Sequence, residues 1–236
     1  MDNINNTLIN ISNLKQYSVF KSLTNSELEE LIQENNCNSY KKGQIIYHEG
    51  NRVKGFYCVY SGIIKIFKTG IEGKEQIIRF AKAGDIIGYR SVLSGENVCT
   101  SAKVNEDALL CFIKSDALFS LLRKNPQFAI DLLKLVSNEL GEANVFITEI
   151  AQKSVKERLA ETIIYLKDSF GIDKENYLNI IITREELANI IGTATESVIR
   201  LLSDFKNEKL IEIKGRKIKL LNIGALQKIA SIYDRS

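Results

Sequence analysis

The sequence predicts an α+β protein that combines an antiparallel β jelly roll, a long helix and a C-terminal winged helix-turn-helix. Three observations carry this prediction. Short β-branched and aromatic runs alternate with glycines over residues 38–112. An apolar heptad pattern runs over residues 126–152. Finally, two short amphipathic segments flank Gly192 in the stretch TREELANIIGTATESVIRLLSDF, residues 183–205.

Composition narrows the class of protein. Hydrophobic residues make up 44% of the 236-residue chain, which is ordinary for a globular protein. No apolar run reaches the ~18–20 residues that a bilayer span needs. The N-terminus lacks the basic start of a signal peptide, so we expect a cytoplasmic protein without a membrane partner. A single histidine, His48, argues against a metal-dependent enzyme on a roll, and no enzymatic activity is expected.

Charge is weakly asymmetric along the chain. The net charge is +3. From Ala151 onward there are 15 Lys and Arg against 12 Asp and Glu, whereas the preceding residues hold 17 of each. The whole excess therefore lies in the half with the helix-turn-helix, as an anion-binding module requires. Chance scatter is an equal alternative for so small an excess.

The N-terminal part is expected to open with helix and continue as strands. Residues Leu14 to Glu34 read as helical, with capping residues and then acidic residues in Ser22–Leu31. Glycines at the corners of the following strands favour a closed roll.

The long helix is expected to start at Pro126 and to end near Gln152. Its apolar residues recur at spacings of three and four, which predicts a seam for a partner helix and therefore a homodimer. Packing on its own roll is the alternative. The seam residues are Leu133, Val136, Leu140, Ala143, Ile147 and Ile150.

The C-terminal part is expected to begin with an amphipathic helix, Ser154 to Phe170, and to continue with a short strand at 180–182. Residues 151–153 are a candidate hinge. A hairpin at 210–221 with a basic tip and a last helix at 226–233 complete it. The predicted division is a β-roll domain with flanking helices at 1–125, a dimerisation helix at 126–152 and a winged helix-turn-helix domain at 153–236.

The helix-turn-helix has its own local signals. Thr183 and Glu186 have the spacing of a capping box, and Gly192 suits the left-handed end of the first helix. Thr193 or Thr195 is expected to cap the second helix. Val198, Leu201, Leu202 and Phe205 recur as a buried face.

The segment TREELANIIGTATESVIRLL resembles, without a gap, the DNA-reading segment of the CRP/FNR family of bacterial transcription regulators. YKKGQIIYHEG, YCVYSGIIKIF and AGDIIG resemble the cyclic-nucleotide-binding roll of the same family. The resemblance covers most of the chain. It implies a dimeric regulator that binds double-stranded DNA at near-palindromic sites with TGA-like half-sites and that works with RNA polymerase.

The resemblance also assigns residues to the DNA. Glu196 and Arg200 match the pair with which the family reads a G·C pair, although an exposed ion pair within the helix is the simpler alternative. Thr195 and Ile199 lie on the same reading face. Backbone contacts are expected from Thr183, Arg184, Thr193, Ser197, Ser203, Arg216 and Lys217.

The expected effector pocket departs from the family pattern. Members that bind cyclic AMP carry a Gly-Glu pair and a following Arg, where this chain has Tyr89 and Cys99. Without the arginine, a buried phosphate lacks its charge-assisted bidentate contact. The resemblance therefore does not predict that this chain binds cyclic AMP. Arg90 as a substitute cation, another small-molecule effector and an empty pocket remain as alternatives. The pocket residues are Gly88, Tyr89, Arg90, Ser91, Cys99, Thr100 and Asn144.

Four cysteines, Cys37, Cys58, Cys99 and Cys111, bear on redox chemistry. Relatives with an iron–sulfur cluster carry a tight cysteine group near the N-terminus, which is missing here, and the lone His48 is a poor basis for a metal site. Neither metal nor haem is expected. We expect buried, reduced thiols. A redox- or haem-sensing member of the family and a nucleotide-binding regulatory subunit are the alternative functions.

Overall fold

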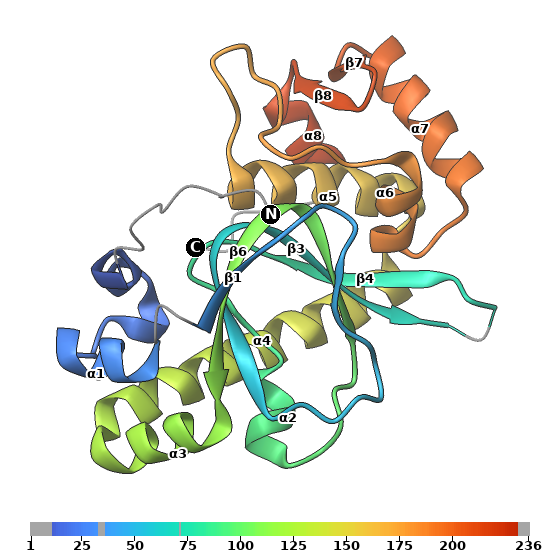
Figure 1. Cartoon of the computed structure of the whole chain (residues 1–236). Helices are drawn as coiled ribbons and strands as arrows, with labels where there is room; N and C mark the ends of the chain where they lie inside the picture. The colour runs from blue at the N-terminus through green and yellow to red at the C-terminus, as the bar shows by residue number, and fades with distance from the viewer. Residues whose placement is uncertain (1–10, 33–35, 71, 231–236) are drawn as a thin grey trace, which may run out of the picture. The chain divides into compact units, whose positions relative to one another are not determined.

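The computed structural model describes residues 11–32, 36–70 and 72–230. The chain divides into two compact units (Figure 1). One contains residues 1–72 and 78–140, and the other contains residues 73–77 and 141–236. The predicted positions at 33–35 and beyond 230, which include the end of the first helical stretch and Tyr233, lie outside the described residues.

The first unit is built around an antiparallel β roll, as the glycine-punctuated pattern predicts. Its main path has the strand order β1-β6-β3-β4, while β2 pairs with β6 and β5 pairs with β3. The long strands β3 and β6 run side by side and carry several register shifts that bend them. The strands are β1 (Cys37–Tyr40), β2 (Ile45–Tyr47), β3 (Gly55–Thr69), β4 (Glu75–Ala81), β5 (Ile86–Ile87) and β6 (Ser101–Lys114).

The paired strands β3 and β6 separate two apolar clusters, because successive side chains point to opposite faces of a sheet. Val59 and Leu110 belong to the cluster inside the roll. Their neighbours Cys58 and Cys111 belong to a cluster that also contains residues of the surrounding helices. One face of the sheet thus forms the interior of the roll, and the other packs against helices.

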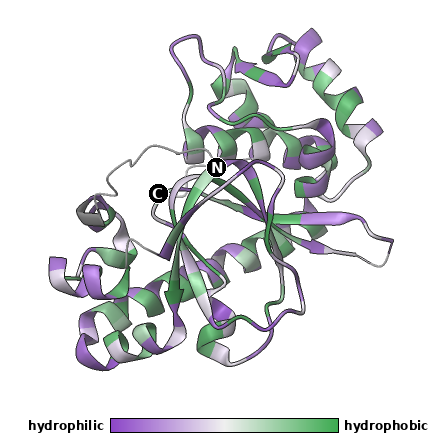
Figure 2. Ribbon diagram, in the orientation of Figure 1, coloured by the Kyte–Doolittle hydropathy of each residue, from purple (hydrophilic) through white to green (hydrophobic). Residues whose placement is uncertain are grey.

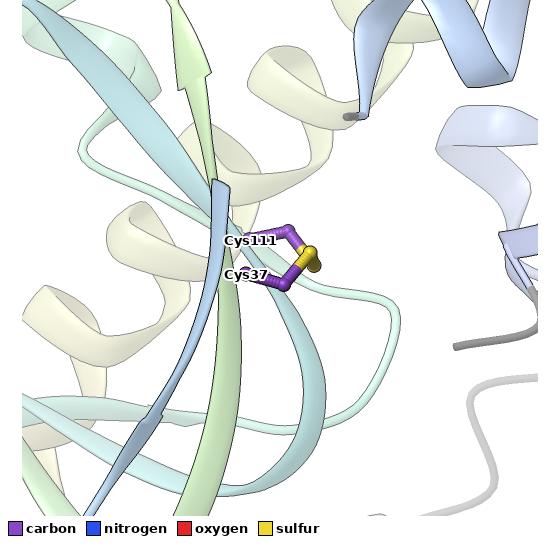
Figure 3. The surroundings of a disulfide bond; sticks show 2 residues. All are labelled: Cys37 and Cys111. Carbon is purple, nitrogen blue, oxygen red and sulfur yellow. A yellow bond between two sulfur atoms is a disulfide. The ribbon is translucent and has the colours of Figure 1, made fainter. Parts of the chain in front are cut away.

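Two of the cysteines form a disulfide, which corrects the expectation of four reduced thiols. Cys37 of β1 lies directly opposite Cys111 of β6, 74 residues later in the chain, with their Cα atoms 3.9 Å apart (Figure 3). Cys58 is a buried thiol, as expected, but Cys99 is exposed. Sequence spacing could not reveal the bridge, because the pairing of the two strands alone brings these residues together.

The opening helical stretch is broken into short pieces instead of one helix. The break follows Gln16, and Tyr17 is extended, with its ring against Gly84. A Cβ at Gly84 would lie 2.1 Å from that ring, and its φ of +90° also requires glycine. Thr24 caps the next helix through a capping box with Glu27. The helices of the first unit are η1 (Ile11–Gln16), η2 (Ser18–Phe20), α1 (Asn25–Leu31), α2 (Tyr89–Ser94) and α3 (Ser115–Lys124).

Helix α4 spans Pro126–Gln152, the residues that the heptad pattern predicts to be helical. Phe128 and Leu132 are buried on one side of it. The seam lies on another side, where Leu133 is 66% and Leu140 63% exposed. Val136, Ile147 and Ile150 are also exposed large hydrophobic residues, and Ala143 is exposed. The seam therefore has no cover within the described chain.

The second unit carries helices α5 to α8 and a two-stranded hairpin. Ser154 caps α5 through a capping box, and Gly171 ends it. The apolar run at 180–182 is not a strand, although Ile180 and Ile182 are buried, because its backbone has no partner strand. The elements are α5 (Val155–Phe170), α6 (Arg184–Ile191), α7 (Thr195–Asn207), β7 (Ile211–Lys214), β8 (Lys217–Leu220) and α8 (Ile223–Ile229).

One guanidinium holds the junction that follows α4. Arg158 of α5 donates to the carbonyl oxygens of Ile150 at 3.3 Å and of Lys153 at 2.7 Å. Its Nε donates to the carbonyl oxygen of Ile191, at the end of α6, at 2.9 Å. The side chain of Lys153 lies 2.6 Å from the carboxylate of Glu161. The predicted hinge residues are thus tied to α5, and through Arg158 to α6.

The structure offers no helix with both the length and the apolar character that crossing a bilayer demands, within residues 11–32, 36–70 and 72–230.

Candidate nucleic-acid interface and effector region

Helix α6 and the turn after it form as the sequence predicts. The hydroxyl of Thr183 accepts from the backbone N–H of Glu186 at 3.1 Å, and the Glu186 carboxylate accepts from the N–H of Thr183 at 2.8 Å. Gly192 ends the helix with a left-handed φ of +68°. The prediction for α7 is wrong in one detail, because its N-cap is Ala194 rather than either threonine. No side chain caps α7, so its first backbone N–H groups keep their partial positive charge for another acceptor.

Helix α7 buries one side and exposes the other. Val198, Leu202 and Phe205 are buried, whereas Leu201 is only half-buried. The ribbon of α7 accordingly alternates between hydrophobic and hydrophilic colours (Figure 2). The predicted reading face is the exposed side: Glu196, Arg200 and Ser203 are exposed, and Ile199 is 54% exposed. Thr195 and Ser197 are half-buried at the start of the helix.

The two charged residues of the reading face have no internal role in the described part of the chain. Glu196 and Arg200 form no ion pair with each other there, so the simpler alternative of an exposed intrahelical pair finds no support. One turn apart on the same face, they offer an acceptor and a fork of donors to a partner. A carboxylate accepts from the exocyclic amine of cytosine, and a guanidinium pairs with the two acceptors on the major-groove edge of guanine.

The predicted backbone-contact residues divide into engaged and free groups. The hydroxyl of Thr183 belongs to the capping box, and Arg184 donates to the carbonyl oxygen of Gly215 at 2.7 Å. Arg184 therefore ties α6 to the hairpin turn. Arg216 and Lys217 are exposed at that turn. Lys214 of β7 lies opposite Lys217 of β8 in the strand register, and two residues form the turn between them. Thr193 is half-buried in the turn between α6 and α7.

In the roll, the predicted effector residues Tyr89 and Ser91 form hydrogen bonds within the protein. Gly88 is left-handed, with φ +78°, and starts α2. The hydroxyl of Ser91 donates to the carbonyl oxygen of Gly88 at 2.8 Å. Tyr89 is only 3% exposed, and its hydroxyl donates to the Glu139 carboxylate of α4 at 2.7 Å. Burial and this carboxylate raise the pKa of Tyr89.

The remaining pocket candidates do not converge on one site. Arg90 is exposed and pairs with Glu96 at 3.0 Å. Cys99 is exposed, while Thr100 forms a side-chain hydrogen bond with the buried Tyr47. Burial raises the pKa of Tyr47 to about 12. Asn144 is exposed and belongs to the second unit.

A charged cluster that sequence reasoning missed lies beside a small cavity of the first unit. Arg79 of β4 lies 3.2 Å from Glu139 of α4 and 3.9 Å from Asp85, and donates to the Ile86 carbonyl oxygen at 3.2 Å. Burial raises the pKa of Asp85. The cavity, of ≈ 100 Å³, is lined by these three charged residues together with Tyr17, Ser18, Val19, Gly84, Ile86 and Leu135. No sequence spacing signals this cluster, because Glu139 of α4 is distant in the sequence from Arg79 and Asp85.

Comparison with known proteins agrees with this architecture. Residues 37–125 match the family model "Cyclic nucleotide-binding domain", and residues 157–229 match "Crp-like helix-turn-helix domain". The fumarate and nitrate reduction regulatory protein of Vibrio cholerae is 28% identical over 94% of this chain and 90% of its own length. Its Escherichia coli counterpart is 30% identical over 80% of this chain and 76% of its own length.

Solved structures show the same fold. FixK2 from Bradyrhizobium japonicum superposes with a TM-score of 0.74 at 24% identity, over 82% of this chain and 96% of that one. A CRP/FNR-family transcriptional regulator from Eubacterium rectale superposes with a TM-score of 0.71 at 20% identity, over 90% of this chain and 97% of that one. With the sequence relatives and both matched domains, these likenesses lead to one conclusion: the chain belongs to the CRP/FNR family of DNA-binding transcription regulators.

Proposed function

We propose that the protein is a homodimeric, sequence-specific transcription regulator whose effector pocket does not follow the cyclic-AMP pattern. The observation that carries the proposal is the reading face of α7. Glu196 and Arg200 stand one turn apart, exposed, on a helix whose other side is buried. Such a helix fits the major groove, with its first turns toward the base edges.

The reading face suggests the order of contacts. Arg200 pairs with guanine and Glu196 accepts from cytosine, which together read the G·C pair of a TGA-like half-site. Ile199, exposed between them, packs against a thymine methyl group. Thr195 lies at the N-terminal end of the same face.

Backbone contacts position the helix without selecting sequence. Arg216 and Lys217, exposed at the hairpin turn, fit adjacent phosphates. The uncapped start of α7 provides backbone N–H groups that favour a phosphate at that end, with Ser197 and Thr193 beside it. Ser203 is exposed farther along α7, whereas Thr183 and Arg184 act mainly by holding α6 and the turn in place.

The exposed seam of α4 supports a dimer. A row of large hydrophobic residues that no other described residue covers is costly in water, and a parallel copy of the same helix covers it by heptad packing. Two copies then present two reading helices to half-sites about one helical turn apart on a near-palindrome. In this arrangement residues 1–125 form the effector domain, 126–152 the dimerisation helix and 153–236 the DNA-binding domain, and RNA polymerase is the partner in the cytoplasm.

Cyclic AMP is not the effector in this proposal. A cyclic phosphate needs a cation at the position that Cys99 occupies, and Arg90 is paired with Glu96 at the surface. A ribose needs an acceptor where Tyr89 instead donates to Glu139. The polar contacts of this loop are therefore made within the protein.

Fluorescence anisotropy tests the proposal. The probe is a duplex with two inverted TGA-containing half-sites, with and without cyclic AMP, and the control is a duplex of the same composition in scrambled order. We expect preference for the specific duplex that cyclic AMP leaves unchanged. Equal affinity for both duplexes contradicts sequence-specific reading, and a requirement for cyclic AMP contradicts the proposed pocket. In the second case Arg90→Gln would show whether this arginine binds the phosphate.

Redox sensing is a second candidate for the input signal. The Cys37–Cys111 disulfide is the specific observation in its favour. The curated relatives, moreover, are named for regulating the reduction of fumarate and nitrate. An absorption spectrum of the freshly purified protein distinguishes the haem form of this alternative, because a haem gives a strong visible band that thiols lack.

A further inference from the structure

Three cysteines form a row across three neighbouring strands. Cys37 of β1 lies opposite Cys111 of β6, and Cys111 lies opposite Cys58 of β3. Residues directly opposite each other in an antiparallel pair project from the same face. Figure 3 shows Cys37 and Cys111 leaving their strands on one side. All three sulfurs therefore lie on the helix-facing side of the sheet, in one apolar cluster.

The members of this row differ in access. Cys111 and Cys58 are fully buried, whereas Cys37 is half-buried at the edge strand. Burial raises the pKa of the Cys58 thiol well above its ordinary value, which keeps it protonated, and Cys111 lies between Cys58 and the edge-strand residue Cys37. Of the bonded pair, Cys37 is the sulfur that a small reagent reaches first. Cys111 then completes the bridge from inside.

The bridge shares its packing with the start of α4. The cluster that holds the three sulfurs also contains Phe128 and Leu132 of α4, Leu118 and Leu121 of α3, and Leu28 and Leu31 of α1. A sulfur–sulfur bond is about 2.05 Å long, and unbonded heavy atoms rest about 3.5–4 Å apart. Breaking the bond therefore requires the sulfurs to separate inside a close-packed cluster. The side chains that seat α4 must adjust, and α4 carries the proposed dimer seam.

We propose that Cys37 and Cys111 are a reversible oxidation site for hydroperoxides, whose state sets the seating of α4 and thereby the affinity for DNA. The DNA part rests on the proposed function above. The thiolate of Cys37 attacks a peroxide oxygen, breaks the O–O bond and becomes a sulfenic acid, with release of hydroxide or alkoxide. The Cys111 thiol then attacks that sulfur and displaces the hydroxyl as water, which forms the S–S bond. With hydrogen peroxide, two thiols and one peroxide give one disulfide and two waters, and a dithiol reverses the change by exchange.

The first test follows the chemistry on the full-length protein. The protein is reduced with dithiothreitol, desalted, treated with one equivalent of hydrogen peroxide, alkylated and mapped by mass spectrometry. We expect a Cys37–Cys111 linked peptide, two hydrogens lighter than the sum of the free peptides, and a free Cys58. Dithiothreitol should remove the link. Thiols that persist at Cys37 and Cys111 while Cys99 oxidises would overturn the proposal, and so would a bridge that dithiothreitol cannot open.

The second test follows the consequence. Hydrogen exchange in peptides covering residues 126–140 should be at least fivefold faster in the reduced form than in the oxidised form. Specific-duplex affinity should differ at least fivefold between the two forms, within the usual range of allosteric coupling. Cys37→Ser should abolish both responses. Cys58→Ala is the matched control, because it removes a sulfur from the same row and cluster but keeps the pair, and it should retain both responses.

The readouts separate this inference from the proposed function. A reversible bridge that changes exchange in 126–140, in a protein that binds neither duplex, leaves the redox site standing and refutes the DNA proposal. Specific DNA binding in a protein whose pair does not oxidise refutes the redox site alone. A bridge that forms while exchange or DNA affinity stays constant refutes the coupling. Cys111→Ala removes the other sulfur of the pair and should also abolish both responses. If this variant of a fully buried residue fails to fold, Cys37→Ser at the half-buried position still tests the proposal.

Discussion

The two units treat their polar side chains in opposite ways. On α7 the charged residues that match the family pattern, Glu196 and Arg200, are exposed and free of ion pairs within the described residues. In the roll, three residues of the predicted effector loop have partners within the protein, Tyr89 with Glu139, Arg90 with Glu96 and Ser91 with Gly88, whereas Cys99 is exposed. One surface is open to a partner, whereas the other is closed by its own contacts.

A family's DNA-reading motif and its effector ligand are therefore separable properties. A base edge lies outside the protein, so a residue that reads it must be exposed. Glu196 and Arg200 are exposed and have the residue types of the family pattern. An internal pocket can replace its ligand contacts with protein contacts, because Tyr89 and Glu139 satisfy each other without a nucleotide. Substitutions on the two surfaces should therefore have different consequences.

The largest effect should come from the open seam. Leu140→Asp together with Ile147→Asp places like charges on facing helices of a dimer, and should convert it to a monomer and weaken specific DNA binding by more than about 100-fold, because the second half-site is lost. Sedimentation velocity and anisotropy on one protein stock measure both effects. Asp substitutions at the exposed, off-seam Ser137 and Asn138 are the control and should change neither. A dimer that survives the seam substitutions refutes the assignment.

The reading face should give the next effect. Arg200→Ala removes a bidentate base contact and should cost about 1–3 kcal/mol on the specific duplex, with little loss on the scrambled one. Anisotropy titrations on the two duplexes measure the difference. An equal loss on both would mean that Arg200 contacts only phosphate, and the contrast between open and closed surfaces would then lose its main support.

The buried hydrogen bond between Tyr89 and Glu139 should affect the stability of the protein rather than its affinity for DNA. Tyr89→Phe removes a hydrogen bond to a carboxylate and should lower the free energy of unfolding by about 1–2 kcal/mol. Because the folded-state pKa of Tyr89 is raised, this contribution is complete below pH ~10 and is lost as the pH rises above that value. Urea titrations at pH 7 and pH 10.5 should therefore show a smaller alkaline loss for the variant than for the parent.

The matched control for Tyr89 lies next to it. Arg90→Gln removes an exposed ion pair with Glu96 and should change the free energy of unfolding by less than about 0.5 kcal/mol. If Arg90→Gln lowers the free energy of unfolding as much as Tyr89→Phe does, the buried Tyr89–Glu139 contact contributes no more stability than the exposed Arg90–Glu96 pair. The view that internal contacts close the effector region would then be wrong.

The smallest effect on DNA binding should come from the wing, the hairpin of β7 and β8. Lys217→Ala should weaken specific and scrambled duplexes alike, by a few-fold, and lower the salt slope of log K by about one, because a single phosphate contact releases about one counterion. The measurement is anisotropy at several salt concentrations. Loss confined to the specific duplex would place Lys217 on a base edge instead.

The local elements could be predicted from the sequence because their signals are local. The capping box at Thr183, the left-handed Gly192 and the hairpin with its basic tip each depend on a few neighbouring residues. The break at Tyr17 could not, because it depends on the packing of that ring against the distant Gly84. The strand predicted at 180–182 had the right burial pattern but lacked a partner, which periodicity cannot reveal.

The sites divide in the same way. The exposure of Glu196, Ile199 and Arg200 follows from helical periodicity within α7. The Arg79–Glu139 pair and the Cys37–Cys111 bridge depend on strand pairing and helix packing between distant segments. The spacing of residues in the sequence therefore does not predict them. Predicting such contacts requires the register of the sheet.

The clamp made by Arg158 has a mechanical consequence. One planar group holds the carbonyl of Ile150 near the end of α4, the carbonyl of Lys153 just after that helix and the last carbonyl of α6, that of Ile191. A rotation of the end of α4 should therefore be transmitted to the reading motif. The same contacts of Arg158 can serve any signal that moves the end of α4. The ligand or redox chemistry of the roll can then differ between proteins that share this connection to the helix-turn-helix.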